Sequence, residues 1–325
     1  MPHRVLMIHT GGTLGMEGTP LSPGSYAGKL VELVPELKAL ADVQTHILCN
    51  LDSSDVGPNQ WSDLVRLIAQ RHEDVDGFVI VHGTDTMAYS ASALAFALPG
   101  LTKPVVFTGA QRPLARVRTD ARRNLVDAIE VATRAEVGEV CICFDGVLLR
   151  GCRARKNNAE HYRAFDSPGT EPLGHLGVHL QFAPSLRAPA SSFASYDRFD
   201  SHVQVAWTAP GTTPIVLYGM AEDGARGVVL VAFGVGNAPL GTGWPNAVAD
   251  LAARGVDVLV VSQAGGMVDL SMYQNGVALR EAGAVSGGRM TVEAAVAKLM
   301  HGLARFPDRA ERHQWLQTDV AGEGA

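Results

Sequence analysis

The sequence predicts an α/β protein, with a doubly wound, mostly parallel sheet in an N-terminal domain and a smaller α/β domain after it. Short apolar runs alternate with segments of helical periodicity, which is the pattern of strands joined by helices in a doubly wound sheet. The runs are continuously apolar, as in strands that are buried on both faces. The expected strands are 5–9, 78–82, 105–108, 140–144, 228–233 and 256–262. The expected helices are 61–72, 87–98, 120–134, 245–254 and 292–303.

A chain of 325 residues has room for about two domains. Pro, Ser and Ala accumulate between residues 183 and 214 and interrupt the alternation of strands and helices. We therefore expect an N-terminal α/β domain at 1–190, a linker at 191–210 and a C-terminal α/β domain at 211–325. The chain after Phe306 is charged and ends in Gly-Glu-Gly-Ala, so we expect this tail to fray.

Composition excludes several classes of partner. Charged residues make up 18% of the chain and the net charge is −6, so no overall field favours nucleic acid. No window approaches the roughly 18 apolar residues of a membrane span, and the apolar run at 5–8 is too short for a signal peptide. The four cysteines form no CxxC pair, and Cys141 and Cys143 alternate with Ile in a strand-like run, which favours reduced, buried thiols. These features predict a cytoplasmic protein.

Two expected strands end in polar clusters, and ligands of open α/β sheets bind at the carboxyl ends of strands. The first cluster is HTGGTLG at 9–15. Its glycines permit a tight turn with exposed N–H groups, and Thr13 follows them as a candidate nucleophile beside an oxyanion site. From this motif alone, a phosphate-binding loop or a plain tight turn is the commoner explanation.

The second cluster is HGTDTM at 82–87, directly between an expected strand and an expected helix. Capping that helix needs only one residue, Asp85 or Thr86. Thr84 and Asp85 together place a hydroxyl beside a carboxylate that can bind an ammonium group. His82 is a candidate general base, although a histidine at a strand end more often only makes hydrogen bonds.

Two further polar segments are less specific. The run LDSSD at 51–55 follows a β-like run and is, by itself, an ordinary loop. The basic run at 150–156 has a solvated loop as its default interpretation, and the alternative is that one lysine enters the site, where burial favours its neutral form.

Several common signatures are absent from the sequence. There is no GxSxG elbow, which disfavours an α/β-hydrolase serine, and no HExxH or Cys/His ligand spacing, which disfavours a catalytic metal. The run GVGNAP at 234–239 lacks the third glycine of a dinucleotide loop, so we interpret it as a turn. The sequence therefore predicts no metal and no organic cofactor.

The motifs TGGT at 10–13 and HGTDT at 82–86 together resemble the paired signatures of bacterial-type L-asparaginases. The resemblance covers most of the chain, and its latter half is closest to the cytoplasmic type I branch. Matching features stand at Met16, DSSD 52–55, TGAQRP 108–113, Lys156, GVGNAP 234–239 and MTVEA 290–294.

This resemblance implies hydrolysis of L-asparagine to L-aspartate and ammonia through a covalent acyl-enzyme. It places the nucleophile on Thr13 and a second triad on Thr84, Asp85 and Lys156, in which a neutral Lys156 takes a proton from Thr84. The implied substrate-binding residues are Asp52, Ser53, Ser54, Thr84 and Asp85, with the serine loop on the α-carboxylate and Asp85 on the α-ammonium group.

The sequence departs from the family pattern at three positions. Members usually carry a tyrosine shortly after the first motif, and the nearest one here is Tyr26. Either Tyr26 reaches the site through a rearranged loop, or another group fills this role. Pro239 stands where some members have an asparagine that reaches a neighbouring subunit's site. Ala264 stands where allosteric cytoplasmic members have a cysteine, so cooperativity is not carried over.

The resemblance also implies partners. Family members form intimate dimers, often dimers of dimers, and the helix at 87–98 has almost no polar face, in agreement with a subunit contact. We therefore expect a homodimer or a dimer of dimers that acts on the small molecule L-asparagine.

Two alternatives remain for the activity. A relative that supplies ammonia to another protein, such as the amidotransferase subunit acting on Glu-tRNA, usually has an extension before the first motif, which here starts at residue 10. A non-catalytic module that binds an amino acid or a nucleotide leaves the conjunction of Thr13, Thr84, Asp85 and Lys156 unexplained.

Overall fold

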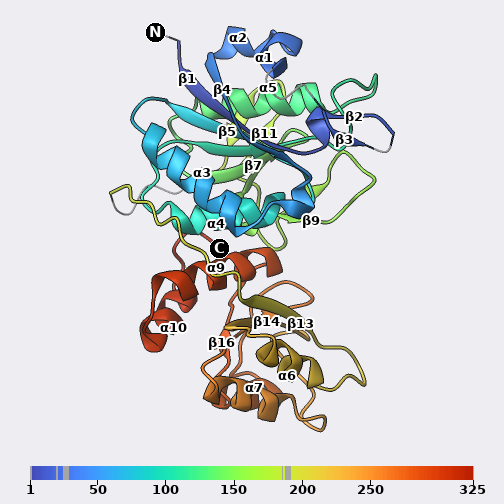
Figure 1. The fold of residues 1–325 in the computed structure, drawn as a ribbon, viewed down its shortest axis with the longest axis vertical. Helices are drawn as coiled ribbons and strands as arrows, with labels where there is room; N and C mark the ends of the chain where they lie inside the picture. The colour runs from blue at the N-terminus through green and yellow to red at the C-terminus, as the bar shows by residue number, and fades with distance from the viewer. Residues whose placement is uncertain (1, 20, 25–28, 185, 187–191, 325) are drawn as a thin grey trace. The chain divides into compact units, whose positions relative to one another are not determined.

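The structure is a computed structural model that describes residues 2–19, 21–24, 29–184, 186 and 192–324. The chain divides into two compact units, Met1–Asp197 and Arg198–Ala325. Each unit is built on its own sheet (Figure 1). The expected fold class is confirmed, because a large, mostly parallel sheet is followed by a smaller parallel one.

The first unit contains an eight-stranded sheet. Its parallel part has the order β4-β1-β5-β6-β7, and three antiparallel strands continue it beyond β7. In order across the sheet, the strands are β12 (Leu180–Phe182), β11 (Gly174–Leu176), β8 (Val147–Arg150), β7 (Val140–Phe144), β6 (Val105–Thr108), β5 (Gly77–Val81), β1 (Arg4–Gly11) and β4 (Asp42–Leu51).

Helices cover both faces of this sheet, with α2 and α5 on one side and α3 and α4 on the other (Figure 1). On the α5 side, Val5 and Met7 of β1 share a core cluster with Leu125. Leu6 and Ile8 alternate with them, point to the opposite face and are equally buried. Burial on both faces explains the continuously apolar runs of the sequence. The helices are α1 (Leu30–Leu33), α2 (Leu37–Leu40), α3 (Pro58–Arg71), α4 (Met87–Ala97) and α5 (Ala121–Ala132).

Helix α4 is buried within the first unit itself. Met87, Ala91 and Leu94 are inaccessible to solvent in the single chain, and the helix contacts β7, α3 and the short helix η4 (Gly151–Arg153). From the sequence, the apolar composition of this helix was interpreted as support for a contact between subunits. That support is lost, because the sheet and the neighbouring helices already enclose the helix.

The second unit has a four-stranded parallel sheet in the order β13-β14-β15-β16. Strand β13 lies inside the stretch expected to be a linker, and it is only partly buried, so its sequence lacks the continuous apolar run of the other strands. The strands are β13 (Val203–Trp207), β14 (Gly227–Ala232), β15 (Asp257–Ser262) and β16 (Val285–Ser286). The helices are α6 (Ile215–Glu222), α7 (Trp244–Ala253), α8 (Gln274–Glu281), α9 (Val292–Arg305) and α10 (Arg309–Gln317).

The C-terminal tail is ordered through Gly324, so the expectation that it frays was wrong. Arg312 of α10 donates to the carboxylate of Asp257 at 2.6 Å, and the Asp257 side chain is inaccessible to solvent. Glu323 is also buried and pairs with Lys298 of α9. The charges that suggested a solvated tail are instead paired with charges of the second unit.

Within the described ranges, no helix is both long enough and apolar enough to cross a membrane. All four cysteines are free, and the expected burial of Cys141 and Cys143 is confirmed.

Candidate active site

The parallel sheet of the first unit places three of the sequence's polar clusters side by side. Strand β1 pairs with β4 on one side and β5 on the other, so the chain order reverses at β1. Ligands of open α/β sheets bind at such a switch point, outside the carboxyl ends of the strands. The clusters at 9–15, 51–55 and 82–87 lie at the carboxyl ends of β1, β4 and β5, respectively.

Two glycines allow these strand ends to approach one another. Gly12 has a φ of 88°, and a Cβ atom there would lie 2.4 Å from the Cα of Gly83. A Cβ atom on Gly83 would in turn lie 2.6 Å from the Cβ of Ser53. Side chains at these two positions would push the loops apart, so the glycines are required for the convergence of the three clusters.

The Ser53 loop is fixed from both sides. Ser53, Ser54 and Asp55 form the short helix η3 (Ser53–Asp55), whose cap is Asp52. The Asp52 carboxylate accepts hydrogen bonds from the N–H of Ser54 at 2.9 Å and its hydroxyl at 2.7 Å, and these bonds lower the pKa of Asp52. Thr86 donates from Oγ1 to the carbonyl of Ser53 at 2.6 Å and so joins this loop to the next one.

The structure brings Thr84, Asp85 and Lys156 into direct contact. Lys156 Nζ lies 2.7 Å from Thr84 Oγ1 and 2.6 Å from Asp85 Oδ1. Thr84 is buried, whereas the Asp85 side chain is 68% exposed and the Lys156 side chain 17% exposed. A hydroxyl, an amine and a carboxylate therefore form one hydrogen-bonded chain whose carboxylate end is open to solvent.

Lys156 belongs to a structured hairpin. Strand β9 (Arg155–Lys156) pairs antiparallel with β10 (Phe165–Asp166), with Phe165 opposite Lys156. Of the other basic residues in this run, Arg150 pairs with buried Glu139 at 2.7 Å, and Arg153 donates to the carbonyl of Pro168 at 2.7 Å. The solvated-loop interpretation of 150–156 was therefore wrong.

His82 makes its hydrogen bonds to groups in the core of the first unit. Trp61 Nε1 donates to Ser90 Oγ at 2.8 Å, and Ser90 Oγ lies 2.9 Å from His82 Nε2. His82 Nδ1 lies 2.7 Å from the carbonyl of Gly83. Complete burial lowers the pKa of His82 to about 4. Because both ring nitrogens are occupied by core groups, His82 fits the hydrogen-bonded interpretation and not that of a general base.

Two candidate residues remain, Thr13 and Tyr26, and of these the structure describes Thr13. Thr13 is half-buried and begins the short helix η1 (Thr13–Gly15) directly after Gly12. Tyr26 lies outside the described residues, as do its neighbours from 25 to 28.

One residue of this site was given no role from the sequence, although it lies in the TGAQRP run at 108–113 that matches the family. Gln111, in the loop after β6, accepts a hydrogen bond from Thr84 Oγ1 at 3.3 Å. The signal that could have identified it is its position after the carboxyl end of a parallel strand, where the other polar clusters also lie.

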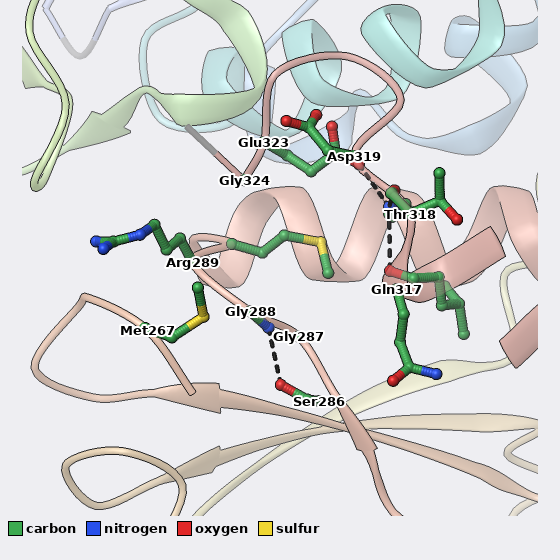
Figure 2. A pocket seen from close by; sticks show the side chains of 13 residues that line it. Met267, Ser286, Gly287, Gly288, Arg289, Gln317, Thr318, Asp319, Glu323 and Gly324 are labelled. Atoms are coloured by element: carbon green, nitrogen blue, oxygen red, sulfur yellow. Dashed lines mark hydrogen bonds and ion pairs between the residues drawn. The ribbon is translucent and has the colours of Figure 1, made fainter. Parts of the chain in front are cut away.

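The second unit contains a hollow of a different kind (Figure 2). Its cavity of about 260 Å³ is bordered by Met267, by Gly287 and Gly288 after β16, and by Thr318 and Glu323 of the tail. The buried charges at this cavity, Lys298 and Glu323, are paired with each other. No group of three or more His, Cys, Asp or Glu side chains in the described part of the chain could hold a metal ion.

Comparison with known proteins identifies the family. The family model "Asparaginase, N-terminal" matches residues 4–187, and "Glutaminase/Asparaginase C-terminal domain" matches residues 202–316. L-asparaginase 1 of Escherichia coli K12 is 34% identical over 98% of this chain and 97% of its own. One subunit of the glutamyl-tRNA(Gln) amidotransferase of Methanopyrus kandleri is 34% identical over 98% of this chain and 74% of its own. The crystal structure of L-asparaginase I from Vibrio cholerae superposes with a TM-score of 0.91 at 33% identity, covering 100% of both chains. Sequence, fold and motifs agree that this chain belongs to the asparaginase family.

Proposed function

We propose that the protein hydrolyses L-asparagine to L-aspartate and ammonia through an acyl-enzyme on Thr13. The hydrogen-bonded chain of Thr84, Lys156 and Asp85 at the switch point is the observation that carries this proposal. The relatives named L-asparaginase support the choice of substrate. The reaction needs a hydroxyl nucleophile, a proton acceptor and an oxyanion site, and no metal or organic cofactor takes part.

In the proposed reaction, Thr13 Oγ attacks the side-chain amide carbon of asparagine. The tetrahedral intermediate collapses, its C–N bond breaks, and the leaving nitrogen takes a proton and departs as ammonia. Water then attacks the ester carbon, and the bond from that carbon to Thr13 Oγ breaks. One proton of the water replaces the hydroxyl proton that Thr13 gave up to the ammonia, and the other dissociates from the new carboxyl group of aspartate. A threonine hydroxyl is a weak nucleophile, so a nearby base is required. A neutral Lys156 takes a proton from Thr84, and Asp85 orients the amine.

The charged ends of asparagine match groups at the site. The exposed carboxylate of Asp85 attracts the α-ammonium group, and the loop of Ser53 and Ser54 takes the α-carboxylate. Asp52 holds that loop in shape through Ser54. Backbone N–H groups of the glycine loop and near Thr84 stabilise the negative charge of the tetrahedral intermediate.

Tyr26 is proposed to fill the role of the family's loop tyrosine, which helps to activate the nucleophile. Tyr26→Phe removes only the hydroxyl, so a large fall in kcat supports this role. An unchanged rate excludes the hydroxyl from the reaction.

We further propose that the protein works in the cytoplasm as a homodimer or a dimer of dimers. The low charged fraction of 18% and the family resemblance support this assembly. Light scattering of the purified protein gives the molar mass, and a mass of one chain contradicts the proposal.

The function is tested by measuring ammonia release from L-asparagine, L-glutamine and D-asparagine at millimolar concentration. We expect release from L-asparagine, and no release from any of the three contradicts the proposed activity. Thr84→Val should remove most of the activity and preserve the fold, as thermal unfolding would show.

The similarity to an amidotransferase supports a second candidate, an ammonia supplier for another protein. A preference for L-glutamine, together with stimulation by a partner protein, would favour this candidate over the first. The side chains of asparagine and glutamine differ by one methylene, which is worth about 1–3 kcal/mol in a pocket, so both substrates belong in the same assay.

A further inference from the structure

The side chain of Gln111 uses all its polar atoms in the described site. Its Nε2 donates to the carbonyl of His161 at 3.0 Å and to that of Asn158 at 3.4 Å. Carbonyl oxygens only accept, so Nε2 must face them and Oε1 must face Thr84. A flipped amide would leave these two carbonyls opposite an oxygen, so the network fixes the orientation of the amide.

This orientation determines where the proton of Thr84 points. A protonated Lys156 has no acceptor site, so it donates from Nζ to Thr84 Oγ1 across 2.7 Å. The single hydroxyl proton of Thr84 is then directed to Gln111 Oε1, at 3.3 Å. Hydrogen bonds therefore run in one direction, from Lys156 to Thr84 and from Thr84 to Gln111.

The proposed reaction requires the opposite direction at Thr84. When Lys156 is neutral, its nitrogen can accept the Thr84 proton, but the hydroxyl must first turn away from Gln111. We infer that Gln111 is a positioning residue that holds the Thr84 hydroxyl away from protonated Lys156. It thereby sets the pH at which the Thr84–Lys156 pair becomes competent. This inference rests on the proposed function.

Hydrogen bonds fix the backbone around Gln111, so the side-chain amide extends from a fixed position. The Asp120 carboxylate accepts from the N–H of Gln111 at 2.9 Å and from that of Arg112 at 3.0 Å. Buried Asn124 donates to the same carboxylate at 3.2 Å. On the other side, Asn158 Oδ1 accepts two backbone N–H groups of its own loop at 2.8 Å. Groups other than Thr84 therefore fix both the backbone of Gln111 and the loop whose carbonyls accept from its Nε2.

The charged groups near the hydrogen-bonded chain of Lys156, Thr84 and Gln111 come from a few elements in the described part of the first unit. Asp85 is the carboxylate in ion-pair contact with Lys156 Nζ. The other charged or titratable groups on the packed elements are Arg112, Arg116, Arg118 and Asp120 in the segment that carries Gln111, Arg155 and Asp166 on the hairpin, Glu160, His161, Tyr162 and Arg163 on the 157–164 loop, Asp52 and Asp55 on the Ser53 loop, and His82 before Thr84. A new charge at position 111 would add directly to the field of Asp85.

The test compares two substitutions that move the pH dependence in opposite directions. Gln111→Met removes the acceptor of the Thr84 proton and keeps a side chain of similar size. The Thr84 hydroxyl then no longer has the orientation that favours protonated Lys156. The rising limb of kcat/KM against pH should move down by about half a pH unit. Gln111→Glu keeps an acceptor and adds a negative charge that favours the ammonium form. The rising limb should then move up by about one pH unit.

The matched controls are Gln70→Met and Gln70→Glu, because Gln70 is an exposed residue of α3. These variants make the same changes in composition and net charge, and they should leave the limb where it is. Opposite shifts at position 111 support the inference. Two results overturn it: shifts of the rising limb in the same direction in both variants, or a lower kcat with the rising limb at its wild-type pH. A Gln111 that only supported the structure would lower the rate without changing the pH midpoint.

A second readout does not depend on activity. Competitive labelling of Lys156 with acetic anhydride, followed by mass spectrometry across pH, reports its protonation in each variant. The labelling midpoints should shift as the kinetic limbs do, and unmoved midpoints in both variants overturn the inference. If Gln111→Met fails to fold, Gln111→Ala carries the same expectation. If the wild-type protein releases no ammonia, the proposed function fails, and the labelling still decides the role of Gln111.

Discussion

The two units each contain a lysine paired with a carboxylate at nearly the same distance, but in different surroundings. Lys156 lies 2.6 Å from Asp85, and Lys298 lies 2.5 Å from Glu323. The side chains of the first pair are 17% and 68% exposed, whereas those of the second are 1% and 3% exposed. Similar distances therefore do not imply similar roles.

The partners of the two lysines explain the difference. Lys298 also donates to the carbonyls of Leu316 and Thr318, at 3.0 and 2.6 Å, so all three of its protons are used inside the protein. Lys156 contacts Thr84 and an open carboxylate that a substrate can reach. The second pair ties the tail to α9, and the first is the pair for which we propose proton exchange. Solvent access at the carboxylate is therefore the feature that distinguishes the proposed reactive pair from the structural one.

The largest expected effect is on catalysis through the first pair. Lys156→Met should lower kcat/KM for asparagine by about 10²- to 10⁴-fold, because it removes the proposed proton acceptor. Thermal unfolding should change little. Lys38→Met, at an exposed position of α2, is the matched control and should retain full activity. A Lys156→Met enzyme with normal turnover would remove the distinction between the two pairs.

The next effect is on stability through the second pair. Lys298→Met leaves Glu323 buried without its cation, and we expect a loss of about 3–5 kcal/mol in the free energy of unfolding. Denaturant titration measures this loss, and activity per folded molecule should stay the same.

The double substitution Lys298→Met with Glu323→Leu sharpens this prediction. Replacing both charges with apolar side chains should recover much of the stability, because no unpaired charge remains buried. A double variant as unstable as the single one would show that the tail depends on the hydrogen bonds of these two side chains to its backbone more than on the pairing of their charges.

Smaller effects follow from buried histidines, one in each unit. Burial lowers the pKa of His82 and of His301 from 6.5 to about 4. The unfolded chain therefore binds protons first as the pH falls, and the stability present above pH 6.5 is lost towards pH 4. At pH 5 the loss should be about 2 kcal/mol per histidine. His301→Gln should make the pH dependence of unfolding shallower, and an unchanged slope would contradict this assignment.

The smallest effect concerns a partly buried carboxylate. Asp127 lies 3.5 Å from Arg123, and burial raises the pKa of Asp127 to about 6. Because the pKa of Asp127 is higher in the folded protein than in the unfolded chain, ionisation of this carboxyl lowers the free energy of unfolding above pH 6. This loss disappears as the pH falls. Asp127→Asn should therefore stabilise the protein at pH 7 by about 1 kcal/mol and have less effect at pH 4. Destabilisation at pH 7 would show that the contact with Arg123 matters more than burial.

Much of the fold could be predicted because its strands are buried on both faces. The expected strands at 105–108 and 140–144 agree with β6 and β7, and the expected helix at 87–98 agrees with α4 to within one residue. Strand β4 was noted only as a β-like run before the 51–55 cluster and was not among the expected strands, because its largely exposed sequence DVQTHILCNL lacks the apolar run of its neighbours. The tail was misjudged for a related reason. Local charge cannot show that Arg312 and Glu323 have partners far away in sequence, at Asp257 and Lys298.

The site could be predicted in part because the carboxyl ends of parallel strands meet at one edge. The loops at 9–15, 51–55 and 82–87 do converge, and Lys156 does reach Thr84. The role that we propose for Gln111 could not be predicted, because it depends on an amide orientation set by two carbonyls from a distant loop. His82 illustrates the opposite case, since a reactive residue type is held in the core by Ser90 and Gly83.

The most direct test of the central claim is ammonia release by wild-type protein and by Thr13→Ala at saturating L-asparagine. Thr13 is half-buried at the start of η1, so removal of its hydroxyl should leave thermal unfolding nearly unchanged. We expect the wild-type protein to release ammonia and the variant to lose most of this activity. Turnover near the wild-type rate in a folded Thr13→Ala protein would contradict the assignment of the nucleophile.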